Sequence, residues 1–133
     1  MADLTQRTDI PSPCYVLEEE KLIRNLELMK RVQDESGVRI ILALKGFSMW
    51  SSFDIIKPYL HGATASSVWE AKLAAEMGKE VHAYSPAYKK ADIEELATLV
   101  NHLSFNSLSQ WQTHKDALAG VSLGLRINPE HQE

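Results

Sequence analysis

The segment Val38-Arg39-Ile40-Ile41-Leu42-Ala43-Leu44 decides the fold class of this chain of 133 residues. Residues 40–44 are all apolar, and the front of the segment is rich in β-branched side chains. A strand without polar alternation is buried on both faces, as in a parallel sheet that helices cover. The segment therefore predicts a buried strand over 38–44 in an α/β fold.

Beyond this strand, strand-like and helix-like segments alternate, with strand centres about 20 residues apart. The predicted strands are 63–66, 81–84, 103–106 and 121–127. The predicted helices are 52–60, 67–77, 91–100 and 107–118. This alternation predicts a parallel sheet with right-handed crossovers. No glycine-rich phosphate turn of the form G-x-G-x-x-G or G-x-x-x-x-G-K occurs, which favours part of a (β/α)8 barrel over an open doubly wound sheet.

The residues ahead of 38–44 predict a helix and, before it, one more strand. From Glu18 the apolar residues recur at helical spacing, acidic residues come first, and Gly37 stands where a helix C-cap belongs. Cys14-Tyr15-Val16-Leu17 follows Pro13, a residue suited to the first position of a strand or to an edge strand. We therefore expect a strand over 14–17 and a helix that ends at Gly37.

Composition and charge exclude several classes of protein. The net charge is −4, from 14 Lys and Arg against 18 Asp and Glu. The sequence has no basic stripe of the kind that nucleic-acid-binding proteins carry, so nucleic-acid binding is not expected. The longest apolar run is far shorter than the roughly 18 residues that span a membrane, and residues 1–7 hold no signal-peptide core. Cys14 is the only cysteine, so no disulfide framework and no thiolate metal cluster is expected. We expect a cytoplasmic protein without nucleic-acid or membrane partners.

Candidate functional residues lie at or near the carboxyl ends of the predicted strands, where α/β barrels carry their active sites. Lys45 directly follows the buried strand, so its amine is predicted to face a partly desolvated site suited to Schiff-base chemistry. A lysine that emerges into solvent is the alternative. Arg126 lies within an apolar run, so we expect a carboxylate, phosphate or phenolate partner, or else a structural ion pair with a neighbouring strand. Thr64 and Ser66 are neutral polar groups able to orient a ligand.

The histidines give no metal motif at helical spacing. No two of them stand four residues apart on a helix beside a carboxylate, so a zinc site is not expected. The histidines are His61, His82, His102, His114 and His131.

Six segments together resemble the alanine-racemase-like PLP enzymes, the fold type III decarboxylases, and among them the carboxynorspermidine (carboxyspermidine) decarboxylases. They occur in the order found in that family and span nearly the whole chain, which makes the set specific. The segments are Pro11-Ser12-Pro13-Cys14-Tyr15-Val16-Leu17, Ala43-Leu44-Lys45-Gly46-Phe47-Ser48-Met49-Trp50, Thr64-Ala65-Ser66-Ser67, Tyr84-Ser85-Pro86-Ala87-Tyr88, Phe105-Asn106-Ser107-Leu108-Ser109-Gln110 and Gly124-Leu125-Arg126-Ile127-Asn128-Pro129.

The resemblance implies a PLP-binding (β/α)8 barrel joined to a separate β domain. Lys45 would hold the cofactor, pyridoxal 5′-phosphate, as a Schiff base, and Arg126 would lie near its phenolic oxygen or ring. Thr64 and Ser66 would be further cofactor-binding residues. At the place of Thr64 ornithine decarboxylases look to have an aspartate, so the contact there would differ. The implied activity is decarboxylation of carboxynorspermidine or carboxyspermidine to norspermidine or spermidine, with PLP as the electron sink.

The resemblance also implies that the chain is roughly the first third of such an enzyme. Residues 1–17 would be the N-terminal arm and a strand of the β domain, and residues 18–133 the first five strand–helix units of the barrel. The implied partners are the substrate, the remaining C-terminal part as a separate chain or polypeptide, and a second copy in a homodimer. The alternatives are another fold type III decarboxylase, for diaminopimelate or ornithine, and a non-catalytic PLP-binding barrel protein.

Overall fold

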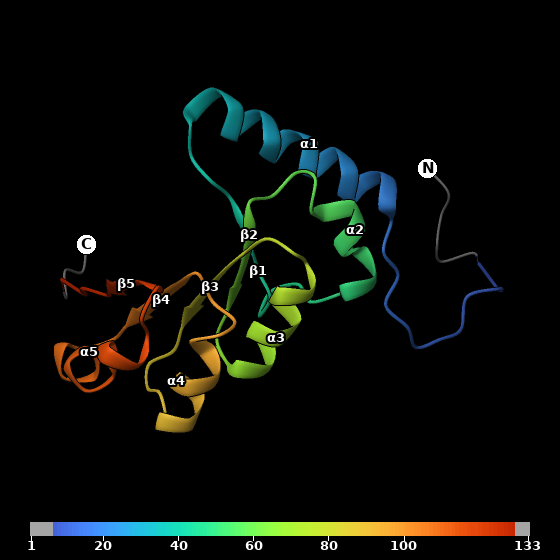
Figure 1. Ribbon diagram of the computed structural model, residues 1–133. Coiled ribbons are helices and arrows are strands. Elements are labelled where there is room, and N and C mark those ends of the chain that lie inside the picture. Colours follow the sequence, from blue (N-terminus) through green and yellow to red (C-terminus); the bar gives the residue numbers. More distant parts are fainter. Residues whose placement is uncertain (1–6, 130–133) are drawn as a thin grey trace.

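The structure is a computed structural model that describes residues 7–129, and its core is one parallel β-sheet (Figure 1). The strands lie in the order β1-β2-β3-β4-β5, and every neighbouring pair is parallel. Their bounds are β1 (Ile41–Ala43), β2 (Gly62–Ala65), β3 (Glu80–Tyr84), β4 (His102–Phe105) and β5 (Ser122–Leu125). The predicted α/β class is confirmed.

Helices precede the sheet and connect its strands. The α-helices are α1 (Glu19–Ser36), α2 (Phe53–Ile56), α3 (Val68–Glu76), α4 (Lys90–Leu96) and α5 (Leu108–His114). Two short 3-10 helices, η2 (Trp50–Ser52) and η3 (Lys115–Ala117), adjoin α2 and α5. Each crossover leads to the next strand in the same direction, whereas a doubly wound sheet reverses its strand order. The order is therefore that of consecutive strands in a (β/α)8 barrel.

Alternation of side chains along the strands divides the sheet into a covered and an uncovered face. The covered face packs with the apolar sides of the helices into one core. Its members are nearly inaccessible to solvent and are Ala63, Ala65, Val81, Ala83, Leu103 and Phe105. Thr64, His82, Tyr84 and Ser104 alternate with them and are only partly buried. In a closed barrel this uncovered face would be the interior.

Helix α1 is attached to the sheet by a buried polar side chain. The Gln33 amide nitrogen donates to the Tyr59 carbonyl at 2.8 Å, and its amide oxygen accepts from the Ile40 N–H at 2.7 Å. These two bonds give partners to the Ile40 N–H, just before β1, and to the Tyr59 carbonyl, between α2 and β2. They therefore hold α1 against the residues that lead into both strands. The helix ends at Gly37, which has a φ of 74° and donates its N–H to the Gln33 carbonyl, as predicted for a C-cap.

The segment Cys14–Leu17, predicted as a strand of a separate β domain, forms no strand within residues 7–129. None of these four residues belongs to a strand, and Tyr15 is fully exposed. A strand exists only where another strand completes its hydrogen-bond ladder, and no strand in residues 7–129 lies beside this segment. The apolar pattern therefore indicates an extended segment, but it does not identify the strand with which that segment would pair.

The other differences concern the ends of elements. The strand predicted over 38–44 is reduced to β1, because its ladder with β2 begins only at the pair Ile41 and Gly62. The helix predicted to reach residue 60 ends at Ile56, two residues before Pro58, and the one predicted to reach residue 100 ends at Leu96. Tight turns complete both segments and return the chain to the sheet.

Among residues 7–129, no helix combines the length and apolar character that a membrane crossing requires. The beginning of the 1–17 segment and the end of the 18–133 segment, with His131, lie outside the described residues.

Candidate functional site

The carboxyl ends of all five strands meet at one edge of the sheet, because the strands are parallel. The residues predicted for function lie at or next to this edge. Lys45 lies in the turn after β1, Ser66 directly follows β2, and Arg126 directly follows β5. Thr64 lies within β2 on the uncovered face. We call this edge the carboxyl edge.

Lys45 stands on a turn that is anchored on one side by a buried residue. Leu44 is 2% exposed, and its N–H donates to the Thr64 carbonyl at 3.2 Å. The N–H groups of Gly46 and Phe47 both donate to the Ala43 carbonyl and close the turn. The backbone of Lys45 is therefore well placed even though its side chain is exposed.

The expected desolvation of the Lys45 amine is absent in this chain. The residue is exposed, and its amine has no hydrogen bond or ion pair with residues 7–129. The site opens to solvent because only five strands and no further covering element surround it here. Within residues 7–129 no carboxylate pairs with the amine, so a ligand aldehyde can reach it without displacing an ion pair.

Thr64 and Ser66 lie on the strand next to Lys45. Ala43 and Thr64 are register partners, and Lys45 and Ser66 each lie two residues further toward the carboxyl edge. The Ser66 N–H donates to Glu70 Oε2 at 2.6 Å at the start of α3. Neither hydroxyl has a hydrogen bond to any residue from 7 to 129. The register thus places Lys45 and Ser66 at neighbouring positions of the carboxyl edge, with Thr64 two residues earlier on β2.

Arg126 lies at the far end of the sheet and is bound to an aromatic residue. Its Nη1 donates to the hydroxyl oxygen of Tyr84, and its guanidinium carbon lies 5.3 Å from the centre of the Tyr84 ring. The Tyr84 hydroxyl donates onward to Asn106 Oδ1 at 3.0 Å. The partner is a phenol hydroxyl and none of the expected anions, and Arg126 makes no ion pair within residues 7–129. The Tyr84–Asn106–Arg126 network connects the carboxyl ends of β3, β4 and β5.

Tyr88 holds the loop that follows Tyr84. Its hydroxyl accepts from the Ser85 N–H at 2.8 Å and donates to the Ser104 carbonyl at 3.1 Å, across to β4. Burial is the main cause that raises the pKa of Tyr88 to about 12. The phenol therefore stays neutral through the physiological range and keeps both bonds. Neither Tyr84 nor Tyr88 was predicted as a structural member of the site, although both stand in the Tyr84-Ser85-Pro86-Ala87-Tyr88 segment.

A mostly apolar hollow of about 610 Å³ lies beside the turn that carries Lys45. The N-terminal arm and the loop after β1 line it together. The lining residues are Tyr15, Val16, Leu17, Gly46, Phe47, Ser48 and Met49. Although 14–17 is no strand, this segment lies next to the candidate site.

Comparison with known proteins confirms the resemblance seen in the sequence. No protein-family model matches the chain. The chain is 47% identical over 127 residues to a carboxyaminopropylagmatine decarboxylase of Synechocystis sp., covering 93% of this chain and 33% of that protein. It is 48% identical over 122 residues to a carboxynorspermidine/carboxyspermidine decarboxylase of Campylobacter jejuni, covering 91% and 32%. The corresponding enzyme of Herminiimonas arsenicoxydans is 39% identical over 121 residues, covering 90% and 33%. The chain spans about a third of the length of these curated relatives.

Solved structures agree with the sequence comparison. The crystal structure of carboxynorspermidine decarboxylase from Campylobacter jejuni, complexed with norspermidine, matches with a TM-score of 0.89 at 47% identity, covering 92% of this chain and 34% of that one. D-threonine aldolase from Filomicrobium marinum matches at 0.78 and 18% identity, covering 90% and 35%. SrLDC, solved with PLP and cadaverine, matches at 0.74 and 19% identity, covering 90% and 32%. The last two matches show a shared fold alone.

Proposed function

We propose that this chain is the N-terminal part of a PLP-dependent decarboxylase that converts carboxynorspermidine or carboxyspermidine to norspermidine or spermidine. The observation that carries the proposal is the position of Lys45, an exposed amine on an anchored turn at the carboxyl edge. The 48% identity with the Campylobacter jejuni enzyme supports the substrate class. The activity would belong to the whole protein, and this chain would supply the part of the active site that contains Lys45.

The residues of this chain would share the binding of the cofactor. Lys45 would attach it covalently through the side-chain amine, and the hydroxyls of Thr64 and Ser66 would donate hydrogen bonds to it. Arg126, oriented by Tyr84, would place a positive charge near its phenolic oxygen. When bound, PLP supplies the electron sink that accepts the electron pair left by departing CO2.

A second candidate substrate is carboxyaminopropylagmatine. The relative from Synechocystis sp. carries that substrate in its name and is 47% identical to this chain. The two substrate classes differ in the group beyond the shared carboxylated amine, a guanidinium in one and a primary amine in the other. Nothing on the carboxyl edge of this chain distinguishes these groups, so an assay must choose between them.

The proposal extends to organisation and location. Residues 1–17 would join a separate β domain, and 18–133 would be the first five strand–helix units of the barrel. Further strands would complete the barrel, because an open parallel sheet leaves unpaired edges at β1 and β5. We include a homodimer, supported by the resemblance alone, and a cytoplasmic location, with which the single cysteine is consistent.

Covalent trapping tests the role of Lys45. The full-length protein is loaded with PLP, reduced with borohydride and digested, and the modified peptide is identified by mass spectrometry. We expect the label on the peptide that contains Lys45, and its loss in Lys45→Ala. Lys79→Ala is the matched control, because Lys79 is also exposed but precedes β3, at the opposite edge of the sheet. A label retained in Lys45→Ala would refute the assignment.

Release of CO2 tests the reaction itself. Carboxynorspermidine, carboxyspermidine, carboxyaminopropylagmatine, diaminopimelate and ornithine are assayed side by side with the PLP-loaded full-length protein. We expect the carboxylated polyamines to be preferred over diaminopimelate and ornithine. Preference for either amino acid would contradict the proposed substrate class, and no turnover of any of the five, with PLP bound, would favour a non-catalytic PLP-binding protein.

A further inference from the structure

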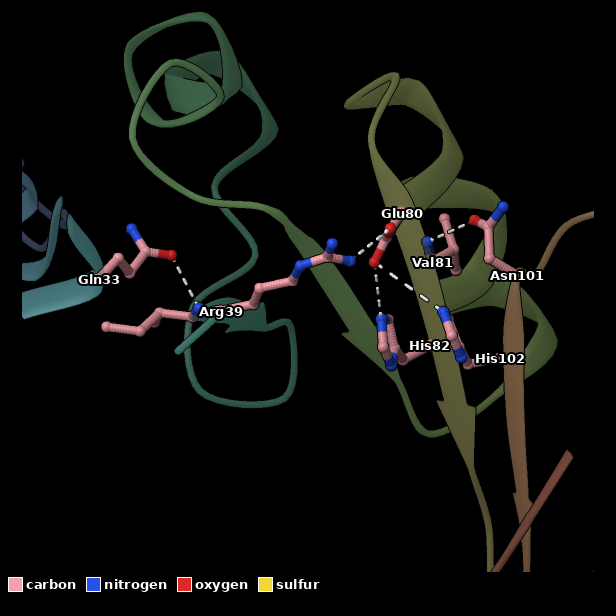
Figure 2. Close-up of polar contacts among 8 residues, drawn as sticks. Gln33, Arg39, Glu80, Val81, His82, Asn101 and His102 are labelled. Carbon is pink, nitrogen blue, oxygen red and sulfur yellow. Dashed lines mark hydrogen bonds and ion pairs between the residues drawn. The ribbon is translucent and has the colours of Figure 1, made fainter. Parts of the chain in front are cut away.

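Three titratable side chains gather on the uncovered face at the amino ends of the strands. Figure 2 shows Glu80 of β3 pointing toward the rings of His82 and His102. Glu80 Oε2 lies 3.4 Å from His82 Nε2 and 3.9 Å from His102 Nε2. The three candidate ligand atoms all lie within 4.8 Å of one another. We call these residues the Glu80–His82–His102 cluster.

Strand geometry brings the cluster together. Glu80 and His82 are two residues apart on β3, so their side chains share one face. His102, the first residue of β4, is the register partner of His82 in the parallel ladder. The two imidazoles consequently stack, with ring centres 4.2 Å apart and planes 16° from parallel. The cluster is therefore a consequence of the backbone pairing and does not depend on flexible loops.

The distances match the needs of a small cation. Zinc ligands lie about 2.0–2.1 Å from the metal in tetrahedral geometry, which separates ligand atoms by about 3.4 Å. The contact between Glu80 and His82 already has this length, and the contact between Glu80 and His102 is only slightly longer. Rotation of the rings about χ2, a broad torsion in histidine, can turn both Nε2 atoms toward one point. We propose that Glu80, His82 and His102 bind a divalent transition-metal cation of the zinc class, with a further position open to water.

Arg39 supports this arrangement from the other side of the carboxylate. Its Nη1 lies 3.3 Å from Glu80 Oε1, which leaves Oε2 directed at the imidazoles (Figure 2). Ligating carboxylates are commonly oriented by such an outer hydrogen bond. In this chain the three side chains are between 31% and 41% exposed, so none of them is buried in the helix-covered core.

The donor set selects the class of metal. Two imidazoles and one carboxylate suit Zn²⁺, whereas Ca²⁺ and Mg²⁺ prefer shells built of oxygen ligands. The cluster lies away from Lys45 in the sheet, since Glu80 begins β3 and Tyr84 ends it, a span of about 13 Å along the strand. In a (β/α)8 barrel the amino ends of the strands serve stability more than chemistry. The cation would therefore lie on the wall of the barrel interior, away from the candidate site at the carboxyl edge.

Titration with cobalt tests the site in the full-length protein, purified without a histidine tag and loaded with PLP. Co²⁺ replaces Zn²⁺ in such sites and gives visible absorbance when it is tetrahedral. We expect one Co²⁺ to bind per chain and Zn²⁺ to displace it. His82→Asn and His102→Asn should each weaken binding by more than about tenfold, since even the loss of an outer-shell partner costs that much. His61→Asn is the matched control, an exposed histidine outside the cluster, and should bind as the wild type does.

Wild-type measurements alone can overturn the proposal. Absence of saturable Co²⁺ and Zn²⁺ binding would show that the cluster is only a hydrogen-bonded ion pair. X-ray absorption at the zinc edge counts imidazole ligands without any substitution, so a variant that fails to fold does not obscure the result. Two imidazoles are expected, and fewer than two would place the metal elsewhere.

Discussion

Arg126 Nη1 donates to the hydroxyl oxygen of Tyr84, although β4 lies between the strands that carry them. The contact spans β4 because both residues lie on the uncovered face of the sheet at its carboxyl edge. Tyr84 donates in turn to Asn106, which follows β4. One phenol therefore orients the cation that we assign to the cofactor, and its hydroxyl accepts one hydrogen bond and donates the other.

Tyr84→Phe is predicted to weaken PLP binding without unfolding the protein. The substitution keeps the aromatic ring under the guanidinium and removes only the hydroxyl that orients it. Loss of one such hydrogen bond, at a partly exposed site, corresponds to a rise of roughly threefold to tenfold in the dissociation constant of PLP. Equilibrium titration followed by absorbance measures this change. Tyr59→Phe serves as the control, because the Tyr59 hydroxyl bonds to no residue within 7–129, and an equal loss in both variants would contradict the prediction.

Gly62→Ala is predicted to destabilise the protein by about 1–3 kcal/mol, the usual cost of overpacking. A Cβ at this position would lie 2.0 Å from the Glu80 carbonyl oxygen, so β2 and β3 would have to separate. The carbonyl oxygen and carbon of Glu80 that the Cβ would meet belong to the backbone, so they cannot rotate away as a side chain could. Urea denaturation measures the free energy of unfolding. Gly46→Ala is the control, since its Cβ would meet only the Ala43 carbonyl oxygen at 3.5 Å, an ordinary contact. Equal stability of Gly62→Ala and the wild type would refute the assigned close contact.

Local sequence signals predicted most of the fold correctly. The regular spacing of apolar segments predicted the positions of all five described strands and of the helices between them, because each helix and strand buries an apolar face. Gly37 and Ser67 mark helix boundaries through short-range geometry, the left-handed φ of one and the hydroxyl of the other, which accepts from the Glu70 N–H at 3.2 Å. These features depend on residues within a few positions of one another, which a sequence displays directly.

Features that depend on distant residues were not predictable in the same way. The segment 14–17 has the apolar pattern of a strand, but whether it pairs depends on a partner that no local pattern specifies. Lys45 was predicted at the carboxyl edge, yet its exposure is set by what else surrounds that edge. His82 and His102 show no metal motif at helical spacing, because their proximity comes from the register of β3 and β4. A signal for the cluster was present in the sequence. Glu80 and His82 stand two residues apart, as residues on one face of a strand do, and His102 lies at the start of the next strand.

Gln33→Ala is predicted to cost about 1–3 kcal/mol of stability, because a partly buried backbone N–H and a partly buried carbonyl lose their partner together. The groups left without a bond would be the Ile40 N–H and the Tyr59 carbonyl. Urea denaturation of the variant and of Gln112→Ala gives the comparison, since Gln112 is an exposed residue of α5. If both variants unfold at the same urea concentration, water replaces the Gln33 amide and its bonds do not stabilise the attachment of α1.

Tyr88→Phe is predicted to change how stability depends on alkaline pH. Burial raises the pKa of Tyr88 from 10.0 to about 12, so the folded state favours the neutral phenol more than the unfolded chain does. This contribution to stability is fully present below pH 10 and is lost as the pH rises from about 10 to about 12. Tyr88→Phe has no phenol to ionise, so it does not lose this contribution as the pH rises. Below pH 10 its free energy of unfolding is lower than that of the wild type, because the bonds to Ser85 and Ser104 are gone. Unfolding midpoints measured across this range should therefore fall less steeply for Tyr88→Phe than for the wild type. Tyr15→Phe, at a fully exposed position, should follow the wild type, and an alkaline slope that is the same in all three proteins would show that Tyr88 ionises as easily in the fold as outside it.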